Sequence, residues 1–111
     1  MEYFVIGERE IVLGFGLVGV SGQVAVSRAE VLDAFMRITG QGGTVAAMSQ
    51  DGRPDVLILT ESASSLIEDE LVVWQMGGKY PLVVEIPGLS GHMRGKRSLT
   101  DAIREAVGIH V

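Results

Sequence analysis

Cysteine is absent from the 111 residues of this sequence, and histidine occurs only at His92 and His110. The absence of cysteine excludes disulfide bonds, zinc sites built from thiolates and a cysteine nucleophile. The two histidines are not spaced as metal ligands on one helix or strand. We therefore expect neither a metal site nor a bound cofactor.

Long apolar runs and excess positive charge are also lacking. No stretch approaches the ~20 apolar residues of a membrane-spanning helix, and the start MEYFVIGERE lacks the basic residues and longer apolar run of a signal peptide. The net charge of −5 argues against general nucleic-acid binding. We expect a soluble, cytoplasmic protein that binds no nucleic acid and does not insert into a membrane. The stretch HMRGKR at 92–97 is a local basic exception.

Apolar residues make up 47% of the sequence, enough for one hydrophobic core. We treat residues 1–111 as a single domain. A two-domain dehydrogenase does not fit in this length, so any nucleotide chemistry would need another chain.

Short, uniformly apolar runs occur at residues 3–6, 56–59 and 82–84, with a weaker one at 23–26. Runs of this kind are typical of strands that helices cover on both faces. We expect these four segments to form a small sheet.

Helix signals alternate with these runs. Ser27 and Glu30 form a capping-box pattern at the start of a helix that Gly40 ends. This helix carries the first apolar stripe: Val31, Leu32, Phe35 and Ile38. A second apolar stripe runs through one helix that ends at Gly77 and Gly78, and a third lies on a helix that begins at 98 and ends at Gly108. The second stripe consists of Ala63, Leu66, Ile67, Leu71 and Trp74, and the third of Leu99, Ala102, Ile103, Ala106 and Val107. The order predicts an α/β fold: a small, mainly parallel four-stranded sheet flanked by helices, Rossmann-like or receiver-like, with a C-terminal helix. We leave the structure of residues 41–54 open.

The sequence GFGLVG at 14–19 has the G-x-G-x-x-G spacing of a dinucleotide-binding turn. Such a turn follows the first strand directly, but here the strand ends near Gly7 and acidic residues come first. The expected acid at the end of a second strand is also missing. We therefore interpret Gly14 and Gly16 as residues that let a short helix pack closely, and Gly19 as part of the turn into the next strand.

A receiver-like magnesium site is the next alternative, because Glu8 and Glu10 follow the first strand. A receiver also needs an aspartate after its third strand, where this sequence has Thr60 and Glu61. Its lysine should follow a later strand, whereas Lys79 precedes one. No histidine lies where it could activate the serines at 62, 64 and 65. We predict no catalytic residues.

The sequence resembles the F subunit of the V-type (V/A-type) ATPases over most of its length. The similarity lies in VIG at 5–7, VLGF at 12–15 and LVGV at 17–20, then in LILTE at 57–61, PLVVEIP at 81–87 and REAVGI at 104–109. Two regions depart from the family: residues 40–54 are rich in glycine, and the loop at 88–97 is longer.

The resemblance implies a non-catalytic part of the rotor. In this family the F subunit binds the coiled-coil axle, which is the D subunit of the central stalk. Through the axle it acts on the nucleotide-binding A/B hexamer and the membrane-sector rotor. The complex couples ATP hydrolysis or synthesis to transport of protons or sodium ions, and the F subunit lies on its cytoplasmic side. A receiver-like signalling domain without its phosphoacceptor aspartate, or a dinucleotide-binding enzyme, remain the alternatives.

Candidate partner-binding residues lie in the basic loop and on the C-terminal helix. The loop would meet acidic side chains of the stalk partner, and the helix would contribute to both folding and docking. The candidates are Arg94, Lys96, Arg97, Leu99, Ile103, Arg104 and Val107.

Overall fold

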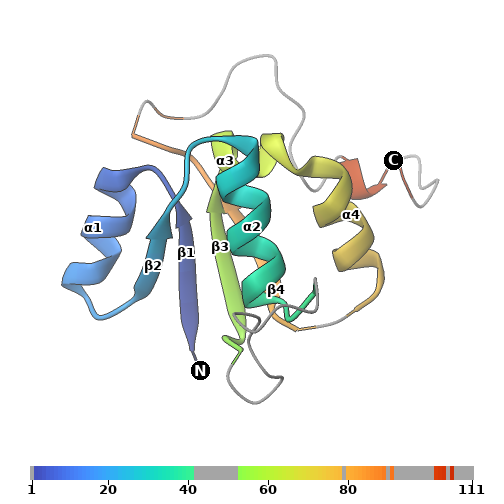
Figure 1. Ribbon diagram of the computed structural model, residues 1–111, viewed down its shortest axis with the longest axis horizontal. Helices are drawn as coiled ribbons and strands as arrows, with labels where there is room; N and C mark the ends of the chain where they lie inside the picture. Colours follow the sequence, from blue (N-terminus) through green and yellow to red (C-terminus); the bar gives the residue numbers. More distant parts are fainter. Residues whose placement is uncertain are drawn as a thin grey trace.

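The computed structural model describes residues 2–41, 53–78, 80–89, 91, 102–104 and 106. Four strands form one sheet in the order β2-β1-β3-β4, and every neighbouring pair is parallel (Figure 1). The elements in chain order are β1 (Tyr3–Gly7), α1 (Arg9–Leu17), β2 (Ser21–Val24), α2 (Arg28–Ile38), β3 (Val56–Thr60), α3 (Glu61–Leu66), α4 (Glu68–Met76) and β4 (Leu82–Ile86). The predicted α/β fold with a parallel four-stranded sheet is confirmed.

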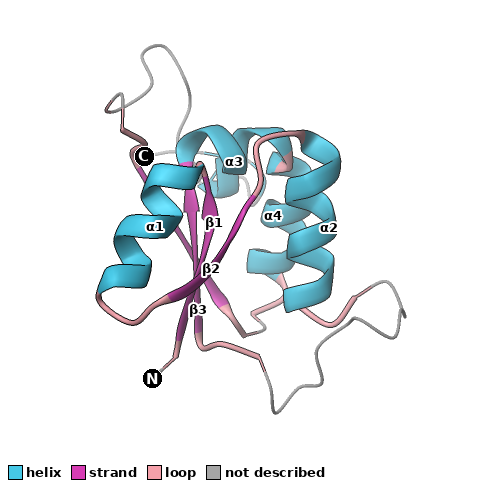
Figure 2. Cartoon of the chain, turned by 60° about the vertical axis from the view of Figure 1, so that its left-hand side comes forward, coloured by secondary structure: helices cyan, strands magenta, loops and turns pink. Residues whose placement is uncertain are grey.

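Helices cover the two faces of the sheet unequally. Figure 2 shows α1 on one side and α2 and α4 on the other. The strands that α1 packs against are mainly β2 and β1, towards one edge of the sheet. On strand β4, Val83 belongs to the core, while Leu82 and Val84 are 47% and 45% exposed. Successive side chains of a strand point to opposite faces, so the face that α1 covers stays half open near β4.

The core lies between the sheet and helices α2, α3 and α4. Phe35 and Trp74 meet there edge to face, with ring centroids 6.0 Å apart, and the indole N–H of Trp74 donates to the carbonyl oxygen of Pro81 at 2.9 Å. The other fully buried large side chains include Ile6, Ile38, Leu57, Leu59, Ile67 and Leu71. Four of the five residues of the second predicted stripe are buried, and Leu66 is partly buried against the core.

The predicted capping box begins α2. The Ser27 hydroxyl accepts from the backbone N–H of Glu30 at 3.2 Å, and the Glu30 carboxylate accepts from the N–H of Ser27 at 3.2 Å. These bonds satisfy N–H groups that the first helical turn leaves without a partner. Gly40 follows the helix with a φ of 74°, the left-handed conformation that suits glycine at a helix end.

The helix predicted through 63–74 is divided in two, which corrects the prediction. Ile67 separates α3 from α4 with φ −130° and ψ 35°, and its side chain is fully buried. Three of the residues just before the break are serines, at 62, 64 and 65, which favour caps and turns over helix interiors. The break lets both helices direct their apolar positions at one core.

Strand β2 begins two residues earlier than predicted. It starts at Ser21, directly after a turn in which Gly19 has a φ of 89°. A side chain at Gly22 would place its Cβ 2.5 Å from Val5 Cγ1 and 2.8 Å from the Val5 carbonyl oxygen. The strand therefore needs glycine there, a residue that strand propensity does not favour.

Candidate functional site

The carboxyl ends of the parallel strands are the first place to look for chemistry in this fold. The residues that meet there bond to one another. The Ser62 hydroxyl donates to Glu8 at 3.4 Å, and the Thr60 hydroxyl accepts from the N–H of Ala63 at 3.4 Å, which caps α3. The Ser64 hydroxyl lies within hydrogen-bonding distance of the Glu85 carboxylate and joins α3 to β4. Thr60 is thus a helix cap.

These contacts do not form a recognisable catalytic or metal site. In the part of the chain that the structure describes, no three side chains of His, Cys, Asp or Glu are grouped so that they could hold a metal ion. β3 ends on Thr60, so the position where a receiver domain has its phosphoacceptor aspartate carries a hydroxyl that caps a helix. Glu10, the other acid of the receiver hypothesis, lies exposed on α1.

The GFGLVG segment does not form a phosphate-binding turn. Such a turn places its glycines at the N-terminus of the helix, where free N–H groups point at the ligand. Here α1 begins at Arg9, so Gly14 and Gly16 lie in its second half and Gly19 lies beyond its end. The predicted role of Gly19 in the turn to β2 is confirmed.

The predicted packing role of the other two glycines is wrong. Apart from the neighbouring residues and backbone of the helix itself, a Cβ built on Gly14 or Gly16 would have no described atom within 4 Å. Both residues are exposed, because α1 has its glycines on the side that faces away from the sheet. No residue of α1 is buried, although most of the helix is apolar.

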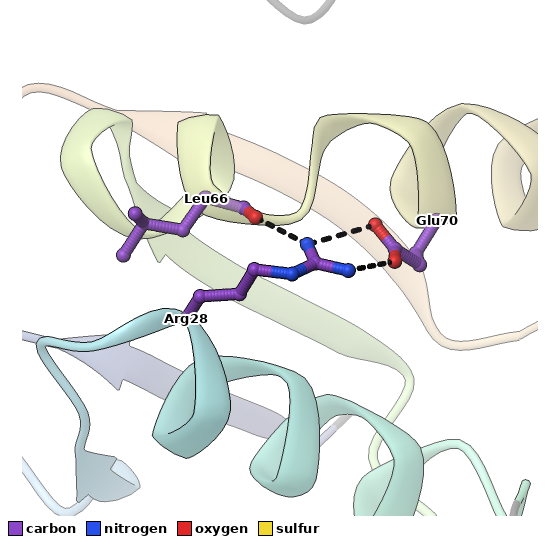
Figure 3. Close-up of polar contacts among 3 residues, drawn as sticks. All are labelled: Arg28, Leu66 and Glu70. Carbon is purple, nitrogen blue, oxygen red and sulfur yellow. Dashed lines mark hydrogen bonds and ion pairs between the residues drawn. The ribbon is translucent and has the colours of Figure 1, made fainter.

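A polar contact holds α2 against the junction of α3 and α4 (Figure 3). Arg28 reaches from the first turn of α2 and donates to the carbonyl oxygen of Leu66 and to the Glu70 carboxylate, each at 2.6 Å. The hydrogen bond from Arg28 holds the pKa of Glu70 below its ordinary value, and the same bond raises the pKa of Arg28. Since the Leu66 carbonyl ends α3, this contact satisfies a helix terminus. Its role is structural.

The C-terminal candidates are only partly described. Residues 102–104 and 106 are helical, as predicted. Ala102 is buried, Ile103 packs against the core and Arg104 is exposed, in agreement with the predicted apolar face; Ala106, assigned to the same face, is exposed instead. Arg94, Lys96, Arg97, Leu99 and Val107 lie outside the described residues, as does the start of this helix.

The sequence-based candidates missed the outer face of α1. Leu13 and Leu17 are exposed there, and Val18 follows the helix with its side chain also exposed. A signal was present in the sequence: residues 11–26 contain no Asp, Glu, Lys, Arg or His in a chain with 21% charged residues. A long uncharged run is ordinarily buried, so the exposure of this one became visible only in the structure.

Comparison with known proteins gives a family for nearly the whole chain. The model of the family described as "ATP synthase (F/14-kDa) subunit" matches residues 4–107. The F subunits of two A-type ATP synthases are similar along their length. The one from Thermococcus kodakarensis is 26% identical over 111 residues, covering 100% of this chain and 98% of its own length. The one from Thermococcus sibiricus is 23% identical over 111 residues with the same coverage.

The match includes residues of every strand of the sheet, and the family's description is that of a subunit of ATP synthase. No described helix is both long and apolar enough to cross a membrane. The resemblance found in the sequence is confirmed: this chain belongs to the ATP synthase (F/14-kDa) subunit family.

Proposed function

We propose that this chain is a non-catalytic rotor subunit in the central stalk of a rotary V/A-type ATPase. It binds the coiled-coil axle, the D subunit, and so supports proton or sodium ion transport coupled to ATP hydrolysis or synthesis. The observation that supports this function best is the family match from residue 4 to residue 107, because it extends over nearly the whole sheet and all the helices that cover it. On this proposal the chain lies on the cytoplasmic side, peripheral to the membrane.

The polar residues at the carboxyl ends of the strands agree with a subunit that binds a partner rather than catalyses a reaction. Thr60, Ser62 and Ser64 each take part in a contact that caps a helix or joins two elements. A serine nucleophile is ordinarily activated by a histidine or lysine base, whereas the described side-chain partners of Thr60, Ser62 and Ser64 are carboxylates and another hydroxyl. ATP chemistry then belongs to other subunits of the complex.

The exposed polar side of the C-terminal helix remains the proposed docking element of that region. Ile103 anchors this segment on the core, and Arg104 beside it is exposed. In the same proposal Leu99 and Val107 extend the apolar stripe, and the basic residues at 94, 96 and 97 meet acidic side chains of the partner.

Reconstitution tests the function directly. The chain is mixed with the coiled-coil subunit and the nucleotide-binding subunits of the same complex, and co-elution and ATPase activity are measured with and without it. We expect co-elution with the coiled coil and a changed ATPase rate, while the chain alone hydrolyses no ATP. A chain that transfers the phosphoryl group of acetyl phosphate to itself, seen as a mass shift, would instead support the receiver-like alternative.

A further inference from the structure

Residues 11–26 carry no charged side chain, and part of this segment forms an apolar surface on the outside of α1. They make up most of α1, the turn after it and strand β2 at the edge of the sheet. Leu17 is 89% exposed, Val18 77% and Leu13 58%. Soluble chains rarely leave several large apolar side chains together in water unless the patch binds something.

The exposed side of α1 has the shape of a ridge between two depressions. Leu13 and Leu17 are four residues apart, so their side chains lie in one row along the helix. Gly14 and Gly16 flank that row, since each helical residue turns the chain by about 100°. Neither glycine has a described atom within 4 Å of where a Cβ would be, so the sides of the ridge are open.

A ridge of this spacing with a groove on each side is the surface that another α-helix fits. Helices pack by placing the i, i+4 ridges of one into the grooves of the other, and glycine lets the two backbones come close. The centre of the face is uncharged, whereas Arg9 and Glu10 precede it at the start of α1. A charged partner surface would lose its hydration there without a counter-charge, so the matching helix must present an apolar stripe.

We propose that this outer face of α1, made of Leu13, Leu17 and Val18 and flanked by Gly14 and Gly16, is the docking site for a helix of the coiled-coil axle. The proposal rests on the function proposed above. It assigns the axle contact to a helix that lies on the opposite side of the molecule from residues 102–104 (Figure 1). The docking contact proposed above for the C-terminal helix would then be a second contact within the complex, separate from this one and tested by its own variants.

The test compares binding of full-length variants to the coiled-coil subunit by calorimetric titration. Leu13→Lys combined with Leu17→Lys should weaken binding at least tenfold, because both changes place a charge at the centre of an apolar contact. Val73→Lys combined with Met76→Lys is the matched control: both residues are exposed apolar side chains on one helix, at 72% and 52%, and the change in charge is the same. The control should bind within twofold of wild type, and both double variants should melt with it.

A second variant separates shape from charge. Gly14→Gln combined with Gly16→Gln fills both depressions with an uncharged residue that favours helix. We expect at least fivefold weaker binding with no loss of thermal stability. If the glutamine variant binds as tightly as wild type, no helix occupies the grooves and the proposal fails.

The remaining outcomes distinguish the two proposals. A wild-type chain that does not bind the coiled coil would refute the rotor function, and this docking site with it. If wild type binds and Leu13→Lys/Leu17→Lys binds equally well, the rotor function stands and the α1 site is wrong. If wild type is a dimer in sedimentation, and the lysine variant is a monomer that still binds the coiled coil, the face contacts a second copy and the proposal is overturned.

Discussion

Replacing Gly14 or Gly16 by alanine should stabilise the folded chain. Both residues lie inside α1 with ordinary helical backbone angles and no described atom within 4 Å of the new methyl group. Alanine is favoured over glycine by about 0.8–1.0 kcal/mol in a helix interior, partly because glycine gives the unfolded chain more freedom. We expect a gain of about 0.5–1 kcal/mol for each change, and the larger gain at Gly14, since Gly16 lies in the last turn, where helices fray.

Two other glycines provide controls of opposite sign. At Gly22 the added Cβ would lie 2.5 Å from Val5 Cγ1 and 2.8 Å from the Val5 backbone oxygen. Overpacking of this kind costs about 1–3 kcal/mol. At Gly19 a Cβ would meet open space, but the backbone φ of 89° suits only glycine. Alanine there should therefore cost about 1–2 kcal/mol.

Urea unfolding followed by circular dichroism measures all four variants under the same conditions. A gain of 1 kcal/mol corresponds to roughly 4 °C in the melting temperature of a domain of this size. The expected order of stability is Gly14→Ala, Gly16→Ala, wild type, then Gly19→Ala and Gly22→Ala. If Gly14→Ala and Gly16→Ala are destabilised as much as Gly22→Ala, α1 packs through its glycines after all, and its outer face is not a free surface.

Three further predictions concern other parts of the chain. The hydrogen bond from Arg28 keeps the pKa of Glu70 in the folded chain below the ordinary 4.5. The contribution of this bond to stability is therefore complete above about pH 4.5 and is lost as the pH falls through the lower pKa of the folded chain. The urea midpoint of wild type should therefore fall more steeply below about pH 4.5 than that of Glu70→Gln, and identical pH profiles would show that the pair adds nothing. Ile103→Asp should lower the free energy of unfolding by about 1–3 kcal/mol, because it places a carboxylate against the core. An unchanged melting curve for this variant would contradict the assigned buried face. Arg104→Glu, at an exposed position, should melt with wild type and change partner binding or ATPase stimulation. Calorimetric titration with NAD(H) or FAD should give no specific binding, and a micromolar constant would restore the nucleotide hypothesis.

Local patterns identified most of the architecture. Uniformly apolar runs marked three of the four strands. Such runs are typical of strands covered on both faces, although β4 has one face half open. The capping residues Ser27 and Glu30 marked the start of α2, since their hydrogen bonds involve only neighbours in sequence. β2 was placed two residues late, because Gly22 is there for its close approach to Val5, a contact that no local pattern contains.

The division between α3 and α4 is not visible in the spacing of the apolar residues. The apolar stripe from Ala63 to Trp74 continues across the break, so its periodicity is that of one helix. Fully buried Ile67 and the bond from Arg28 to the Leu66 carbonyl fix the break, and Arg28 is 38 residues away along the chain. Contacts between distant segments decided this detail.

Residue order and spacing were enough to predict the α/β class, that GFGLVG does not begin a helix as a phosphate-binding turn does, and the resemblance to the F-subunit family. They were not enough to predict which apolar residues are buried. Leu57 and Leu17 are both leucines in apolar runs, yet one is fully buried in the sheet and the other is 89% exposed on α1. Burial depends on what packs against a residue from elsewhere in the chain, and here the helices of the core lie on one face of the sheet while α1 covers only the edge of the other. The proposed docking face follows from that arrangement.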